Sequence, residues 1–163
     1  MTRTYTGKIY YLRDSLITVV LMEFKTSTIK QKITVTASPE EVYEAFMNPE
    51  VHSAFTGDKA TGVPEVGQKF TAGDGYISGK NLELVKGKKL VQEWKTSEWP
   101  SGYPPSIFKL TFRKTKDGTV INMTHSKVPT EQAEYYRQGW IDYYWNPLKE
   151  YFDKKTKKDS NSV

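Results

Sequence analysis

The fold is decided by residues 130–152, which read TEQAEYYRQGWIDYYWNPLKEYF. In the preceding residues, from Thr119 to Val128, side chains alternate as in a sheet strand, which predicts a strand that ends at Pro129. Within the stretch, large and mostly aromatic side chains recur at helical spacing, namely Ala133, Tyr136, Trp140, Tyr144, Leu148 and Phe152. A helix with so long an apolar stripe is stable only when another surface covers it. We therefore expect a curved sheet that wraps around a long C-terminal helix.

The residues before this helix predict a strand, two short helices and a series of antiparallel strands. A strand is expected over residues 28–36, where apolar side chains alternate. Ser38 to Glu41 is typical of a helix N-terminus, with a capping serine, an early proline and a capping box. The pair Asn48-Pro49 then separates two short helices. From Lys59 to Val128 apolar and polar residues alternate with a period of two and turn signals recur, which indicates about six antiparallel strands. The expected fold class is α+β, with the sheet gripping the terminal helix.

Two residues of the terminal helix are unusual for a helix interior. Gly139 has no side chain, so we expect the helix backbone to approach a neighbouring element closely there. Pro147 lacks a backbone N–H and predicts a kink, at a cost of about 3 kcal/mol if nothing compensates it.

The length of 163 residues indicates one domain. We expect an N-terminal extension over residues 1–27, the sheet-and-helix domain over residues 28–155, and a basic flexible tail over residues 156–163. Residues 15–24 (SLITVVLMEF) are too few to span a bilayer, and they lack the small-residue cleavage site of a signal peptide. They are open to interpretation as an extra strand or helix, or as an extension that precedes a start at Met22.

Composition excludes several kinds of site. The chain has no cysteine, which excludes disulfides, thiolate zinc sites and cysteine nucleophiles, and fits a reducing compartment such as the cytoplasm. The net charge of +5 comes partly from lysines near the C-terminus. No arginine-rich stripe or RNA-binding motif accompanies it, so we do not expect a nucleic-acid partner.

Candidate catalytic residues are few. No phosphate-binding loop or nucleophile elbow is present. The two histidines, His52 and His125, are too few for a histidine-rich metal site, and we expect both to be structural. An acid–base role would require a carboxylate within hydrogen-bond reach. We therefore predict a protein that is not an enzyme and needs no metal or cofactor.

One loop has an unusual composition. Residues 98–105 (EWPSGYPP) place two large rings, Trp99 and Tyr103, among prolines and a glycine. Loops normally favour polar residues, because they lie in water. Trp99 either folds back to cap the end of the sheet or, with Tyr103, forms a contact surface for a partner.

Several segments, in a fixed order over about residues 29–153, carry a specific resemblance. They are SPEEVYEAF from Ser38, AFTG from Ala54, GQKF from Gly67, DGYISG from Asp74, WKTSEWPSG from Trp94, LTF from Leu110 and RQGWIDYYW from Arg137. Together they resemble the C-terminal domain of the activator of heat-shock protein 90 ATPase, within the START-like helix-grip group.

The resemblance implies a co-chaperone that binds heat-shock protein 90 and stimulates its ATPase. Such a partner favours the closed state by differential binding and donates no catalytic residue. From loop position and residue type, the candidate contact residues are Phe55, Lys59, Trp99, Tyr103 and Arg137. Only about 28 residues precede the resemblance, and we see none of the basic docking motif of the family's N-terminal domain. Whether a single domain stimulates the ATPase is therefore open.

A second hypothesis is a binder of small apolar molecules. Helix-grip domains often enclose a cavity between the sheet and the terminal helix. The rings that would line such a cavity here are Tyr76, Trp94, Phe108, Phe112, Trp140 and Tyr144. The competing interpretation is that these rings simply fill the space, because protein cores pack densely.

Overall fold

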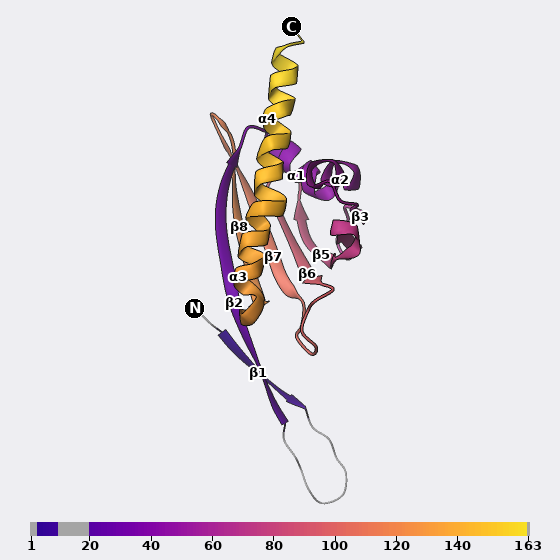
Figure 1. Cartoon of the computed structure of the whole chain (residues 1–163), viewed down its shortest axis with the longest axis vertical. Coiled ribbons are helices and arrows are strands. Elements are labelled where there is room, and N and C mark those ends of the chain that lie inside the picture. Colours follow the sequence, from indigo (N-terminus) through magenta and orange to yellow (C-terminus); the bar gives the residue numbers. More distant parts are fainter. Residues whose placement is uncertain (1–2, 10–19, 163) are drawn as a thin grey trace, which may run out of the picture.

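The computed structural model describes residues 3–9 and 20–162, and the side chains of residues 24–162. The chain forms one antiparallel sheet, a pair of short helices and a long terminal helix that lies along the sheet (Figure 1). The elements in chain order are β1 (Arg3–Ile9), β2 (Val20–Val35), α1 (Pro39–Met47), α2 (Pro49–Thr56), β3 (Thr61–Gly62), β4 (Lys69–Ala72), η1 (Gly73–Gly75), β5 (Ile77–Val85), β6 (Lys89–Thr96), β7 (Ser106–Thr115) and β8 (Gly118–Pro129).

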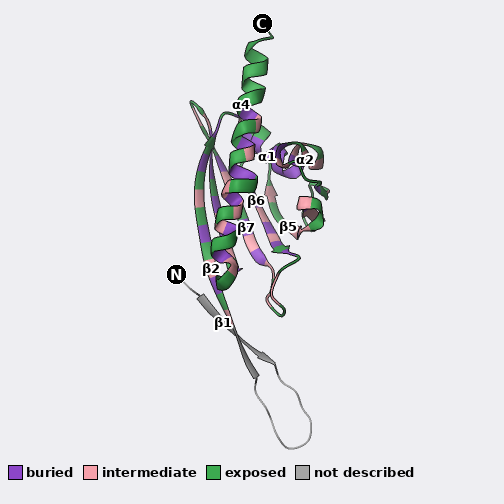
Figure 2. Cartoon of the chain, in the orientation of Figure 1, coloured by how far each residue is buried: buried purple, intermediate pink, exposed green. Residues whose placement is uncertain are grey.

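A continuous helical segment closes the chain. It begins as the 3-10 turn η2 (Thr130–Gln132) and continues as α3 (Ala133–Trp140), the π turn η3 (Ile141–Trp145) and α4 (Asn146–Ser160). All six residues of the predicted apolar stripe are buried. In Figure 2 the buried side of this segment faces the sheet, and its last turns are exposed.

The sheet has eight strands among the described residues, in the order β1-β2-β8-β7-β6-β5-β4-β3, and every neighbouring pair is antiparallel. The predicted α+β class, the curved sheet and the two short helices are confirmed. The predicted strand count of about six is low, because β1 lies outside the predicted domain and β3 has only two residues.

The strand predicted over residues 28–36 begins earlier than expected. β2 begins at Val20 rather than near residue 28, and its first half pairs with β1. The end of the apolar run therefore belongs to a strand, while residues 10–19 lie outside the described part of the chain. At the other end, α4 continues to Ser160, so most of the expected tail is an exposed helical extension.

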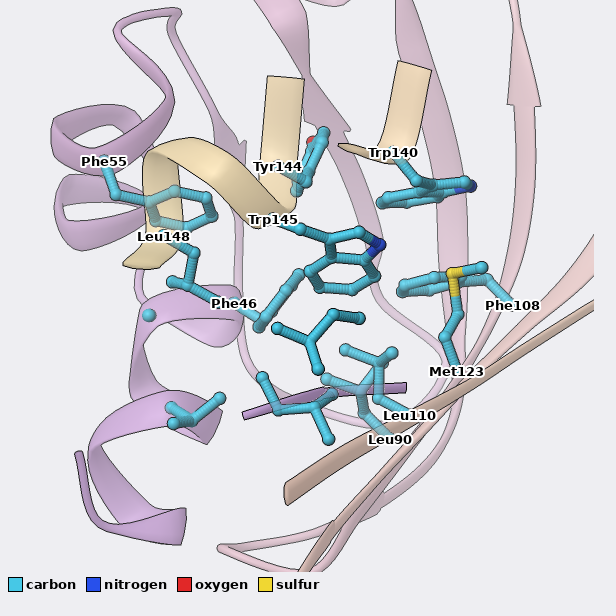
Figure 3. Close-up of a cluster of buried hydrophobic side chains, with 14 of the residues drawn as sticks. Phe46, Phe55, Leu90, Phe108, Leu110, Met123, Trp140, Tyr144, Trp145 and Leu148 are labelled. Carbon is cyan, nitrogen blue, oxygen red and sulfur yellow. The ribbon is translucent and has the colours of Figure 1, made fainter. Parts of the chain in front are cut away.

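Side chains from three strands meet the helix in rows across the concave face of the sheet. Ile29 on β2 pairs with His125 on β8, which in turn pairs with Phe108 on β7. The ring of Phe108 stacks on Trp140 of the helix, with 4.5 Å between ring centroids and an interplanar angle of 4°. Figure 3 shows this stack beside Met123, with Trp145 next to Trp140. The helix and the sheet are thus joined through rings.

The π turn explains how the helix tolerates Pro147. An α-helix would need a hydrogen bond from the nitrogen of Pro147 and would place its ring against the carbonyl four residues earlier. Instead, the five residues before Asn146 widen into a π turn, in which the Asn146 N–H donates to the Ile141 carbonyl. The predicted disturbance is therefore a local change of helix type within a continuous helical segment.

The π turn also changes which side chains face the sheet. It rotates the later part of the helix, so that the adjacent residues Tyr144 and Trp145 are both buried. The regular spacing of the predicted stripe does not include Trp145, which is 2% exposed.

The prediction for Gly139 is wrong. Among the described residues, a side-chain carbon added at Gly139 would meet only the ring of Tyr143, at 3.9 Å, so no other described element approaches closely there. A close approach exists instead at Gly79 on β5, where an added carbon would lie 1.9 Å from the Glu93 carbonyl oxygen.

Candidate ligand pocket and contact surface

An open pocket of about 330 Å³ lies between the terminal helix and the part of the molecule formed by α2, η1 and the start of β5. Most of its walls are aromatic. The lining residues are Thr56, Asp58, Gly73, Tyr76, Ile77, Trp94, Tyr135, Tyr136, Gly139, Trp140, Tyr143 and Tyr144. Its volume is at the lower end of the range of small-molecule sites.

The backbone of η1 shapes one wall of the pocket. Gly73, Asp74 and Gly75 all have positive φ, between 56° and 91°, which is why two of the three are glycines. The Asp74 carboxylate accepts a hydrogen bond from the Lys59 N–H at 2.9 Å, and the Asp74 N–H donates to the Lys59 carbonyl at 3.1 Å. These two hydrogen bonds hold the chain after α2 against η1.

The hydroxyl groups of three lining tyrosines are already bonded within the protein. Tyr76 donates to the Glu98 carboxylate at 2.6 Å, Tyr136 to the Gln132 side chain at 3.1 Å, and Tyr144 to His52 at 3.0 Å. Burial is the main cause that raises the pKa of each of these hydroxyls above its usual value. The three groups are therefore uncharged at neutral pH.

Four of the six rings that we predicted to line a cavity do line this pocket: Tyr76, Trp94, Trp140 and Tyr144. The other two do not. Phe108 borders a separate space of about 30 Å³ that Trp94, Trp140 and Tyr144 also line, and the Phe112 ring packs against Tyr43. Thirty cubic ångströms holds about one water molecule. The space beneath the helix is thus nearly filled, and the larger cavity lies at its edge.

His125 is part of a buried chain of hydrogen bonds. The Trp140 N–H donates to Nδ1 of His125 at 3.1 Å, so the ring proton lies on Nε2, which donates to the Ser106 hydroxyl at 2.7 Å. Ser106 in turn donates to the Trp94 carbonyl at 2.6 Å. Burial lowers the pKa of His125 to about 3. This series of hydrogen bonds includes no carboxylate, which fits the predicted structural role of His125.

His52 has a similar arrangement on α2. Its Nδ1 bonds to the Phe46 carbonyl at 3.2 Å and therefore carries the proton, and its Nε2 accepts from Tyr144. Burial lowers the pKa of His52, which favours the neutral ring. This histidine joins α1, α2 and the helix.

The predicted contact residues do not form one surface. Phe55 is only 6% exposed and packs against Phe46 and Tyr144, so we remove it from the candidate contact residues. Lys59 is exposed next to the pocket. Arg137 lies on the β2 side of the helix, where its carbonyl accepts from Gln31 and its guanidinium pairs with Glu134 at 3.1 Å.

The aromatic loop folds back onto the domain. The half-buried Trp99 ring packs against Trp94 and Tyr136, and its N–H donates to the Pro104 carbonyl at 3.1 Å. Of the two interpretations of Trp99, the structure therefore supports the cap. The half-buried Tyr103 ring packs against the ring of Phe24 on β2, with 4.8 Å between ring centroids.

Sequence reasoning missed the two most exposed rings of the pocket. Tyr135 and Tyr143 are 63% and 67% exposed, and they stand one helical row away from the buried stripe. With Gly139 they form a second series with a spacing of four residues, which was the available signal.

The described residues contain no group of three or more histidine or acidic side chains that could hold a metal ion. Within the same part of the chain, no helix is long and apolar enough to cross a membrane.

The curved sheet closed around a C-terminal helix defines a START-like helix-grip domain. The chain belongs to the family described as Activator of Hsp90 ATPase homolog 1-like protein, which it matches over residues 36–153. It is similar to the human Activator of 90 kDa heat shock protein ATPase homolog 1, with 36% identity over 131 residues. That alignment covers 80% of this chain and 38% of the human protein.

The Activator of 90 kDa heat shock protein ATPase homolog from Dictyostelium discoideum is 32% identical over 118 residues, which cover 71% of this chain and 30% of that protein. The chain therefore spans well under half the length of these relatives.

Solved structures confirm the fold. An HSP90 activator from Plasmodium falciparum superposes with a TM-score of 0.64 at 24% identity, over 73% of this chain and 89% of that one. The Aha1 dimer from Colwellia psychrerythraea gives a TM-score of 0.64 at 18% identity, over 76% of this chain and 96% of that one. At these identities the comparison establishes the fold alone.

Proposed function

We propose that this protein is a co-chaperone that binds heat-shock protein 90 and stimulates its ATPase by favouring the closed state. The observation that carries the proposal is the family match over residues 36–153, together with 36% identity to the human activator. Because the chain spans 38% of that relative, activity of this domain by itself is part of the proposal.

The proposed mechanism is differential binding rather than chemistry. A ligand shifts a conformational equilibrium only by as much as it prefers one state over the other. We propose that the protein is not itself an enzyme. In support, both histidines are buried, neutral and bonded to groups other than carboxylates.

The test is the ATPase rate of heat-shock protein 90 from the same source, titrated with this chain. A saturable rise is expected, with tighter binding in the presence of a non-hydrolysable nucleotide. A flat rate without detectable binding would refute the proposal. Binding without a rise would refute stimulation by this domain alone.

Charge reversal at the candidate contact residues sharpens this test. Lys59→Glu and Arg137→Glu should each weaken binding if their positions lie in the contact. Lys116→Glu, in the exposed turn between β7 and β8, is a matched control that should bind normally. Equal affinities in all three variants would remove Lys59 and Arg137 from the contact surface. We place the interaction in the cytoplasm, which cell fractionation would check.

A second candidate function is the binding of a small molecule with an apolar body. The pocket of about 330 Å³ between the helix and the start of β5 favours it, since four of the predicted ring residues line that space. Native mass spectrometry of the purified protein and a thermal-shift panel of small apolar compounds would test this candidate. No bound molecule and no shift would argue against it.

A further inference from the structure

We propose that the aromatic pocket binds a small organic ammonium ion, with the charged head against the aromatic walls and near Asp58. The proposal rests on the second candidate function, because it names the class of ligand for the same pocket. It is independent of the interaction with heat-shock protein 90.

The walls of the pocket suit a cation with methyl or alkyl substituents. Trp140 packs against Tyr144 with 4.7 Å between ring centroids, and Trp94 packs against Tyr136 with 5.2 Å, so these pairs form continuous aromatic walls against which a cation would lie. The exposed rings of Tyr135 and Tyr143 stand on the helix at the same pocket. The face of an aromatic ring carries partial negative charge and attracts a cation within about 6 Å of its centre.

The charge of the pocket has the sign that a cation requires. Asp58 is the only lining residue with a charged side chain at neutral pH. Its carboxylate has no lysine or arginine within ion-pair distance among the described residues. Glu98 adds a second carboxylate close by, since it accepts the hydrogen bond of Tyr76. Lys59 is the neighbouring cation, but it does not line the pocket.

The buried walls of this space offer an anion few free hydrogen-bond donors. The hydroxyls of Tyr76, Tyr136 and Tyr144 and the Trp140 N–H all donate to protein acceptors. The Thr56 hydroxyl donates to the His52 carbonyl at 2.9 Å. A carboxylate or phosphate that enters the pocket would therefore lose water without gaining these donors, and would lie close to Asp58.

Gly139 keeps the pocket open. It has ordinary helical backbone geometry, and a side-chain carbon placed there would meet only the Tyr143 ring, at 3.9 Å. A larger residue at this position would extend into the pocket.

The first experiment separates charge from shape. Choline and its uncharged carbon isostere, 3,3-dimethylbutan-1-ol, are titrated into the protein while NMR follows the ligand methyl protons and the protein amides. Choline should bind at least about tenfold more tightly than the isostere, and its methyl protons should shift upfield where they lie against the rings. Benzyltrimethylammonium, which fills more of the pocket, should bind more tightly than choline.

Equal binding of choline and the isostere would overturn the ammonium proposal while supporting an apolar ligand site. If none of the three probes binds, the ammonium proposal fails. The thermal-shift panel then decides separately whether the second candidate function survives.

Variants locate the site. Asp58→Asn should weaken choline binding several-fold and leave the affinity for the isostere unchanged, because only the charge is lost. Asp117→Asn, an exposed aspartate in the turn between β7 and β8, is the matched control and should bind choline normally. Gly139→Leu should abolish binding of all probes with the melting temperature retained. Unchanged choline binding in both Asp58→Asn and Gly139→Leu would place any ammonium site elsewhere.

Discussion

The two sides of the terminal helix differ in how they meet the sheet. On the β2 side, the side chain of Gln31 accepts from the Trp145 N–H at 2.6 Å and donates to the Arg137 carbonyl at 3.0 Å. On the opposite side, Tyr135, Gly139 and Tyr143 face α2 and η1 across a pocket of about 330 Å³. One side is sealed by packing and hydrogen bonds, and the other is left open.

This difference separates stability from function within one helix. Residues on the sealed side are buried or half-buried and have their polar groups satisfied, so changes there should act mainly on the free energy of unfolding. Residues on the open side are exposed large rings and a glycine, which contribute little to the core. The open side is therefore where binding can vary without loss of the fold.

Trp145→Ala should have the largest effect. It removes a side chain that is 2% exposed and packs against Phe46 and Trp140. We expect a loss of about 3–5 kcal/mol in the free energy of unfolding, measured by urea denaturation. Tyr143→Ala, two positions earlier on the open side, is the comparison and should change stability by about 0.5 kcal/mol or less. Similar losses in the two variants would contradict the distinction between the sides.

Gln31→Leu should come next. The change keeps the volume but leaves the Trp145 N–H and the Arg137 carbonyl without their side-chain partner. Because unsatisfied buried polar groups are costly, we expect a loss of about 2–3 kcal/mol in urea denaturation. Lys32→Leu, at the next position of β2 with its side chain exposed, is the control. An unchanged free energy of unfolding for Gln31→Leu would show that the packing of the helix does not depend on these two hydrogen bonds.

The pH dependence of stability should show that water is excluded from the region beneath the helix, where His125 is buried. The pKa of His125 is about 3 in the folded protein and about 6.5 when unfolded, so only the unfolded state gains this proton between those values. Stability should therefore be complete above pH 6.5 and fall by about 2 kcal/mol between pH 7 and pH 5 from this residue. His52, whose pKa is also lowered by burial, adds to the fall.

NMR of the imidazole nitrogens assigns the acid effect to its residue. The His125 ring should remain neutral down to pH 5, with the proton on Nε2. A ring that titrates near pH 6.5 in the folded protein would mean that water reaches the region beneath the helix.

Gly139→Ala should have the smallest effect, and of the opposite sign. Glycine in a helix interior is about 1 kcal/mol less favourable than alanine, and the added carbon meets only Tyr143. We expect a gain of up to about 1 kcal/mol, measured by thermal unfolding. Gly79→Ala, where the added carbon would clash with the Glu93 carbonyl, should instead destabilise the protein. A loss at Gly139 would show that the open side is more tightly packed than the structure indicates.

The helix stripe, the capping box at Ser38 and the concave strand faces were predictable, because each is a local pattern with a known period or motif. Four rings of the pocket were predictable for the same reason. Trp145 was not, since a π turn changes the helical phase and is not encoded by simple spacing.

Residue types and their spacing along the chain were enough to determine that this protein is a sheet that grips a ring-lined helix, without cysteine chemistry. They also carried the family resemblance. Only the tertiary structure decided that Phe55 is core, that Trp99 is a cap, and that the helix has a sealed side and an open side. The physical reason is that burial and pocket shape depend on contacts between residues far apart in the chain. Gln31 and Trp145, separated by 114 positions, are one such contact.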